Sequence, residues 1–264
     1  MINLLRSDFF KLFKSKALYI CTLIAILLTA GTIFIVDWAS HMVIKAQESG
    51  DVVVEGMTLY KDGLNCGLNV FSDGSVHLFM AIFIAIFVTA EFAHGTMKNI
   101  VSKGFKRYQV YLSKVITMTA ATFLMLFVVS IFTTISGTVV TGTFGEVTGE
   151  LIGQMLRMIG VELLLHTALT AVFVMVAMVV KNNGGVIAIN IGITMFAALL
   201  YQLLELLFKN KIAFSDYSVM NNMINMRNLT LPGMDILRAI LVAVAFFAVT
   251  VAIGIFAFNK TDVK

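Results

Sequence analysis

The sequence predicts an all-α integral membrane protein with six transmembrane helices, an amino-terminal interfacial helix and a short cytoplasmic helix between spans two and three. Hydrophobic residues make up 59% of its 264 residues, and only 13% are charged. Soluble chains carry about 25% charged residues, so this chain has too little polar surface for a water-exposed globule. The apolar residues also gather in long runs. These observations exclude disorder, collagen and small disulfide scaffolds.

Six apolar runs are long enough to cross a bilayer, since a hydrocarbon core of roughly 30 Å requires about 20 helical residues. An even number of spans places both termini on one side. The first run is too long for a secretion signal, and no small-residue cleavage pattern follows it, so we expect a retained anchor. We treat 1–264 as one transmembrane domain, with spans at 17–36, 75–93, 115–140, 158–180, 185–208 and 239–258.

The charged residues indicate orientation. Most Lys and Arg residues lie at the two termini and between Glu91 and Lys114, whereas most acidic residues lie in the alternate segments. Cytoplasmic loops carry the excess of Lys and Arg, so we expect both termini and segment 94–114 in the cytoplasm. This pattern favours a bilayer over a nucleic-acid partner. The extracellular segment 37–74 forms either a small ordered cap or a solvated loop.

Residues 1–16 have the pattern of an amphipathic helix. Their apolar residues recur at helical spacing, whereas Arg6, Asp8, Lys11 and Lys14 avoid that stripe. Such a helix lies in the headgroup layer with its lysines facing anionic lipid. The alternative is a topology signal without folded structure. The expected stripe comprises Ile2, Leu5, Phe9, Leu12 and Phe13.

The cytoplasmic segment 94–114 contains a second short helical pattern. Gly95 and Gly104 bracket eight residues, among which Met97, Ile100 and Val101 share one helical face. A helix this short is marginal in water, which favours docking in a partner's groove. The alternative is a basic loop with incidental apolar residues. The basic residues around this face are Lys98, Lys103 and Arg107.

A motif spans this segment and the ends of the flanking runs. It resembles the pattern E-x-x-x-G-T-x-[KR]-N, followed by R-x-x-x-x-x-x-K, of the ABC-2 type permeases, a large bacterial family of ATP-binding-cassette exporters. The six-span layout and the basic amino terminus are also similar. The family's proline before the arginine is replaced here by Gly104-Phe105-Lys106. The motif residues are Glu91, Gly95, Thr96, Lys98, Asn99, Gly104, Arg107 and Lys114.

The resemblance implies a permease subunit in the bacterial cytoplasmic membrane. In that family the segment is a coupling helix that contacts a separate ATPase subunit, which binds ATP and magnesium. Two permease subunits, identical or sister chains, pair with two ATPases. Members often export or expel antimicrobial peptides, lipids or drugs. The resemblance implies ATPase contacts at Glu91, Gly95, Thr96, Met97, Lys98, Asn99, Ile100, Val101, Gly104 and Arg107.

The sequence contains no G-x-x-x-x-G-K-[ST] phosphate loop, so we expect a non-catalytic chain that takes its energy from a partner. No H-E-x-x-H or C-x-x-C occurs, and four histidines and two cysteines have no metal-binding spacing. One alternative is a stand-alone channel or secondary transporter, although no repeated halves are present. Another is an intramembrane protease of the abortive-infection type, which requires glutamates and histidines that converge within the spans.

Polar residues within the spans are the remaining candidates for function. Glu162 and His166 share a helix face, as do Glu205 and Lys209. These residues either reach the headgroup layer or line a polar translocation path with Asn190 between the fourth and fifth spans. For Asn190 the alternative is an interhelical hydrogen bond. The methionines at 220, 223 and 226 predict a short helix that dips into the outer leaflet.

Overall fold

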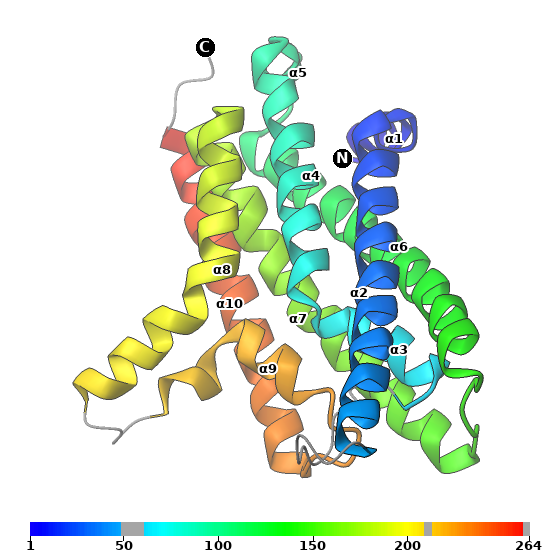
Figure 1. Cartoon of the computed structure of the whole chain (residues 1–264). Helices are drawn as coiled ribbons and strands as arrows, with labels where there is room; N and C mark the ends of the chain where they lie inside the picture. Colours follow the sequence, from blue (N-terminus) through cyan, green and yellow to red (C-terminus); the bar gives the residue numbers. More distant parts are fainter. Residues whose placement is uncertain (49–60, 209–212, 261–264) are drawn as a thin grey trace.

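The computed structural model describes residues 1–48, 61–208 and 213–260, with side chains up to Met42 in the first range; every regular element there is helical (Figure 1). Six helices are long and apolar enough to cross a membrane, so the chain is an all-α, multi-pass membrane protein. They are α2 (Lys16–Glu48), α4 (Gly74–Ala93), α6 (Arg107–Thr141), α7 (Gly149–Val180), α8 (Asn183–Leu207) and α10 (Gly233–Lys260).

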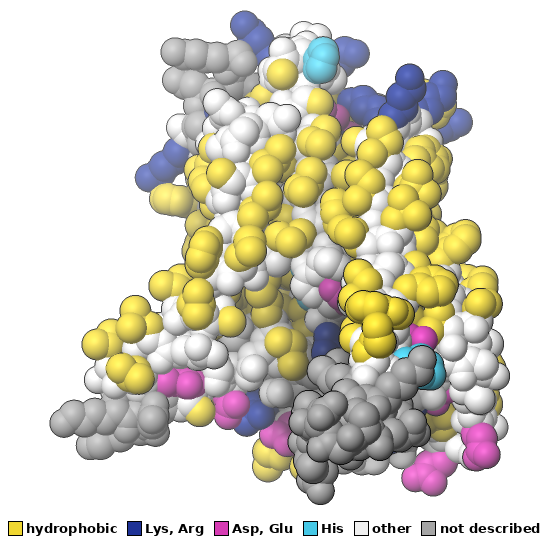
Figure 2. Space-filling model, in the orientation of Figure 1, with side chains coloured by type: hydrophobic (Ala, Val, Ile, Leu, Met, Phe, Trp, Pro, Cys, Tyr) yellow, Lys and Arg dark blue, Asp and Glu magenta, His cyan; other side chains and the backbone are white. Residues whose placement is uncertain are grey.

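Short helices lie at the two ends of this bundle (Figure 1). At one end lie α1 (Ile2–Lys14), α5 (Thr96–Ser102) and the carboxyl end of α10. The opposite end carries α3 (Gly63–Asn69), η1 (Val70–Ser72), η2 (Phe214–Tyr217) and α9 (Val219–Asn225). Lys and Arg side chains gather at the first end, and Asp and Glu side chains at the second, with an apolar belt between them (Figure 2). We call these the basic end and the acidic end.

Burial differs among the spans. In the most hydropathic window of α4 and of α7, 61% of the residues are buried within the bundle, against 11% in α8. The two central helices therefore form the core, while α8 turns most of its surface to the surroundings. Exposed Leu, Phe and Met side chains on α8 are consistent with lipid as its solvent.

Three spans begin earlier than the apolar runs that predicted them. Helix α6 begins at Arg107, α7 at Gly149 and α10 at Gly233. Their first turns are polar, so hydropathy alone places the starts too late. At α7 the side chain of Thr148 accepts a hydrogen bond from the Leu151 amide and caps the helix. Residues 107–114, expected in a loop, therefore belong to α6.

The described part of segment 37–74 is ordered. Helix α2 continues to Glu48, and α3 with η1 packs against α6. Glycines make this packing close: a Cβ at Gly137 would lie 2.6 Å from the Cys66 sulfur, and one at Gly67 would overlap the Thr134 side chain. Small residues let helices approach in this way in membrane proteins.

The methionine-rich stretch forms a short helix, as its spacing predicts. Helix α9 buries Met223 and leaves Met220 half-buried, and Met226 is buried directly after it. The Asn222 side-chain amide donates to the backbone oxygens of Asp216 and Ser218, each at 2.8 Å, so this buried group finds its acceptors within the protein.

Candidate coupling site and buried polar clusters

A buried group of charges joins three helices at the basic end. Lys114 on α6 donates from Nζ to Asp8 Oδ1 of α1 at 2.6 Å and to Glu91 Oε1 of α4 at 2.7 Å. Lys11 of α1 donates to the same Glu91 oxygen at 3.0 Å, and Ser113 donates to Asp8 Oδ2 at 2.6 Å. Lys114 and Asp8 are fully buried. We call Asp8, Lys11, Glu91, Lys114 and Ser113 the ion cluster.

The ion cluster accounts for the two outer residues of the sequence motif. Glu91 and Lys114 are 23 residues apart, yet they form one ion pair across the start of the coupling segment. The resemblance implies an ATPase contact at Glu91. Charges inside protein need partners, and two acidic groups here meet two basic groups. These two motif residues thus hold the helices in position and do not project from the surface.

Asp8 corrects the prediction for the amino-terminal helix. It was expected on the polar face, but Leu4, Asp8 and Leu12 form the buried face of α1, which packs on α6. Of the expected apolar stripe, Leu12 is buried and Leu5 and Phe9 are half-buried, while Ile2 and Phe13 are exposed. The helix therefore docks on the bundle through one face and offers Ile2, Phe10 and Phe13 to the surroundings.

Helix α5 stands at the outermost part of the basic end (Figure 1). Gly95 precedes it with φ of +66° and Gly104 follows it with φ of +85°, values that favour glycine. Met97 is fully buried in the protein's own core, and Ile100 and Val101 are half-buried. The predicted apolar face therefore turns inward at Met97. The exposed face carries Lys98, Asn99, Ser102 and Lys103.

Arg107 ties this segment to the last span. Its Nη1 donates to the backbone oxygens of Phe258 at 3.0 Å and Asn259 at 2.9 Å, near the carboxyl end of α10. Carbonyl groups at a helix end lack helical donors and carry partial negative charge, so a guanidinium suits them. Arg107, expected to contact a partner, thus has a role within the chain.

A cavity of about 280 Å³ lies beside the ion cluster. Its lining includes Lys11, Phe87, Glu91, His94 and Thr96, so it lies between α1, α4 and the start of α5. Glu91 Oε2 is buried and has no hydrogen-bond partner. Segment 94–114 therefore lies next to the buried ion cluster and a small cavity, and its helix α5 has an exposed polar face.

A second buried polar cluster lies towards the acidic end. His77 Nε2 on α4 is 3.1 Å from His166 Nε2 on α7, and His166 Nδ1 is 2.7 Å from the backbone oxygen of Glu162. Ser72 of η1 donates to Glu162 Oε1 at 3.4 Å. All four residues are buried. We call His77, His166, Glu162 and Ser72 the histidine cluster.

Of the four residues expected on a translocation path, Glu162 and His166 contact each other, whereas Asn190 and Glu205 bond to other residues. Glu162 and His166 face α4 and η1, and not the space between the fourth and fifth spans. Asn190 is buried and donates to the Ala81 oxygen at 3.5 Å, as an interhelical bond between α8 and α4. Glu205 accepts from the Ser215 amide at 2.7 Å and so anchors η2.

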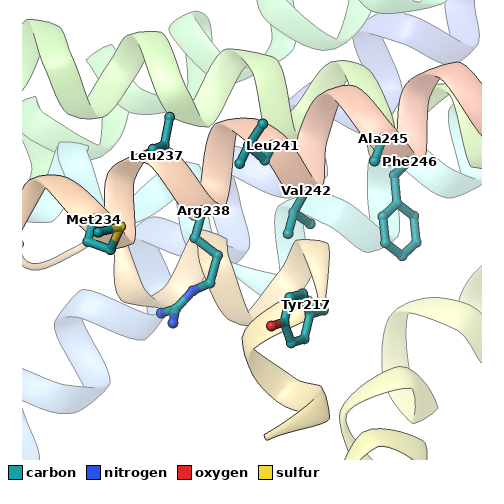
Figure 3. A pocket seen from close by; sticks show the side chains of 8 residues that line it. All are labelled: Tyr217, Met234, Leu237, Arg238, Leu241, Val242, Ala245 and Phe246. Carbon is teal, nitrogen blue, oxygen red and sulfur yellow. The ribbon is translucent and has the colours of Figure 1, made fainter.

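A groove of about 490 Å³ runs along α10 at the acidic end. Figure 3 shows Arg238 reaching from α10 towards the segment that carries Tyr217. Arg238 forms ion pairs with Asp216 at 3.0 Å and Asp235 at 2.9 Å. The remaining lining is apolar and includes Leu241 and Phe246. The groove therefore has an apolar floor with one ion network at its edge.

Sequence reasoning missed Asp8, His77 and Ser72. For Asp8 a signal existed, because Leu4, Asp8 and Leu12 are four residues apart and share a helix face. Nothing in the local pattern marks His77 or Ser72. Within the described parts of the chain, no group of three or more His, Cys, Asp or Glu side chains could hold a metal ion.

The six long apolar helices define an all-α, multi-pass membrane protein. Its basic end carries the short helix α5 between the second and third spans. Residues 71–264 match the family described as "Protein of unknown function (DUF2705)". The match covers more than half of the chain, so the protein belongs to this family. It includes α5, the histidine cluster and five of the six spans. No curated protein matches the chain.

Proposed function

We propose that the protein is the permease subunit of an ATP-binding-cassette exporter in the bacterial cytoplasmic membrane, with both termini in the cytoplasm. The observation that carries the proposal is the ion cluster beneath α5. It joins α1, α4 and α6 where a motor protein would have to push. The motif resemblance, the basic charge of this end and the six spans support the same function.

The ion cluster provides a physical means for a force on α5 to move α1, α4 and α6 together. Helix α5 directly follows α4 and precedes α6, so a force on α5 acts on both spans. Lys114 of α6 forms ion pairs with Asp8 of α1 and Glu91 of α4. If one of these three helices moved alone, a buried ion pair would have to break. Leaving one member of a buried ion pair without its partner costs about 3 to 5 kcal/mol. The force would therefore move the group as one body.

The proposal implies two kinds of partner. Separate ATPase subunits bind ATP and magnesium and dock on the exposed face of α5, and a second permease subunit, identical or a sister chain, completes the pathway. The chain itself has no phosphate loop. Its cargo belongs to the classes of antimicrobial peptide, lipid or drug that the resembling exporters carry.

Co-purification tests this proposal. The full chain is expressed with any phosphate-loop ATPase that a neighbouring reading frame encodes, and the ATPase retained in detergent is quantified. We expect Lys98→Glu combined with Lys103→Glu to lower retention at least about tenfold, because both exposed lysines lie on the proposed contact face. Lys260→Glu, also exposed at the basic end, serves as the matched control and should retain the ATPase.

Two results would contradict the proposal. One is equal ATPase retention by the double variant and the control. The other is transport by the purified chain in vesicles without any ATPase, which would favour a stand-alone channel or secondary transporter.

One observation favours a second candidate, an intramembrane protease. His77 joins Glu162 and His166 inside the bundle, so acid and base groups converge there. Only one glutamate is present in this cluster. Glu162→Gln combined with His166→Gln should abolish peptide-bond cleavage if the protein is a protease, and an unchanged cellular function in that variant would eliminate this candidate.

A further inference from the structure

The histidine cluster has an unusual arrangement of hydrogen-bond donors and acceptors. His166 Nδ1 faces the Glu162 backbone oxygen at 2.7 Å. A carbonyl oxygen only accepts, so this nitrogen carries a hydrogen. A neutral His166 then has a bare Nε2, and the hydrogen between the rings, 3.1 Å apart, must come from His77. His77 also forms a hydrogen bond with the Phe71 backbone, so a neutral His77 has one ring hydrogen for two contacts.

These hydrogen bonds run in one direction, from His77 through His166 to Glu162. A neutral His77 that donates from Nε2 has a bare Nδ1. One additional proton on the pair would give His77 a second N–H, and the hydrogen between the two Nε2 atoms can then move to either ring. The charge of a single proton is therefore shared by two imidazoles, which lowers the cost of holding it inside protein.

A counter-charge lies next to the pair. Glu162 is fully buried, and its Oε2 has no hydrogen-bond partner, although it lies 3.7 Å from His166 Nδ1. Burial without partners disfavours the ionised form of a carboxyl group, and a positive charge on the neighbouring rings would favour that form. The other charged groups that act on the cluster are Asp73, at the start of α4, and Arg227, after α9.

From this geometry we infer that His77 and His166 form a binding site for one proton, with Glu162 as its counter-ion. The proton comes from water, one N–H bond forms on the imidazole pair, and no electron is transferred. This site does not depend on the proposed transport function. It lies between α4 and α7, beneath η1, in a part of the bundle that no sequence motif marks.

Proton binding would also act on the acidic end. Arg227 Nη2 donates to the Ser72 backbone oxygen at 3.2 Å, while the Ser72 hydroxyl donates to Glu162 Oε1 at 3.4 Å. A positive charge on the histidine pair attracts Glu162 and repels Arg227. Both effects weaken the contact that holds η1 and the turn after α9 against the spans.

Nitrogen-resolved NMR of the full chain in lipid nanodiscs tests the site, because the protein has only four histidines. With ¹⁵N-labelled histidine, we expect one ring with hydrogen on Nδ1 and one with hydrogen on Nε2 at neutral pH. On acidification both buried rings should shift together with one midpoint and a total uptake of one proton. This measurement needs no variant.

Variants identify the groups. Glu162→Gln should lower the midpoint by about one to three pH units, since a nearby carboxylate stabilises the protonated pair by that order. His77→Gln should abolish the shared titration of His166. His94→Gln is the control, because His94 is exposed at the opposite end of α4 and should leave the shared midpoint unchanged.

Three outcomes would overturn the inference. The two buried rings could stay neutral until the protein unfolds, or they could titrate independently of each other. Alternatively, one equivalent of Zn²⁺ could shift both Nε2 signals and block proton uptake, which would replace the proton site with a metal site.

Discussion

Lys114 illustrates how a charged side chain is accommodated inside this protein. Its ammonium group is fully buried and donates to two carboxylates, Asp8 and Glu91, at 2.6 and 2.7 Å. Lysine normally keeps its charge in water, so complete burial requires such partners. The side chain also passes near the Phe87 ring, 5.8 Å from its centroid. Lys114 thereby connects the first helix of the chain to two spans.

Replacement of Lys114 by methionine should strongly destabilise the protein. Met fills similar volume but leaves Asp8 and Glu91 without their main partner, so we expect a loss of about 3 to 5 kcal/mol in the free energy of unfolding. Denaturation in mixed micelles measures this loss. Lys106→Met, at an exposed position, should change stability by no more than about 0.5 kcal/mol.

A second variant separates charge from packing. Asp8→Asn added to Lys114→Met removes the carboxylate that has lost its ion-pair partner and should recover part of the lost stability. No recovery, or a Lys114→Met protein as stable as the wild type, would mean that the ion cluster does not hold the helices together.

Among the elements, the six spans could be predicted from the sequence and α3 could not. The spans follow from apolar runs of about 20 residues, a pattern set by bilayer thickness. Helix α3 has the sequence Gly63-Leu-Asn-Cys-Gly-Leu-Asn69, which lacks both length and a broad apolar face. It is stabilised by close packing on α6 and by the Asp62 cap, so its tertiary partner determines it.

The labelling rate of the Cys66 thiol reports whether α3 is packed against α6. Burial, and next the negative charge of Asp62, raises the pKa of the Cys66 thiol to about 11. The thiolate is the reactive form, so maleimide labelling of the wild type should be slow at pH 7 and accelerate only as the pH approaches 11. Gly67→Leu would drive a side chain into Thr134 and should raise labelling at pH 7 at least about tenfold.

Gly74→Ala is the control for this measurement, because a Cβ there meets no atom within 4 Å. Rapid labelling of wild-type Cys66 at neutral pH, or equal labelling in Gly67→Leu and Gly74→Ala, would show that α3 is not held against α6 as described.

At the scale of the whole molecule, the charge pattern was predictable and the buried clusters were not. Lys and Arg residues near the termini and in 94–114 predict one basic end, which Figure 2 shows. The ion cluster joins residues 8, 91 and 114, and the histidine cluster joins 77 and 166. Such pairs depend on which helices pack against each other. Hydropathy and helical periodicity do not predict this packing.

Accessibility to a membrane-impermeant thiol reagent tests the orientation. Cys21 and Cys66 are both free and buried, so the wild type gives a low background. Ser102→Cys, on the exposed side of α5, should be labelled only after the cells are opened, because the positive-inside rule puts the basic end in the cytoplasm. Glu146→Cys, exposed at the acidic end, should be labelled in intact cells. The reverse pattern would invert the topology and remove α5 from reach of a cytoplasmic motor.

The composition of the ion cluster has one further consequence. Asp8 and Glu91 contribute two negative charges, and Lys11 and Lys114 contribute two positive charges. Moving one elementary charge across a membrane potential of 100 mV involves about 2.3 kcal/mol of electrical work. Since the four groups sum to zero, their joint displacement along the membrane normal transfers no net charge. The membrane voltage therefore does no net work on these four groups when they move together.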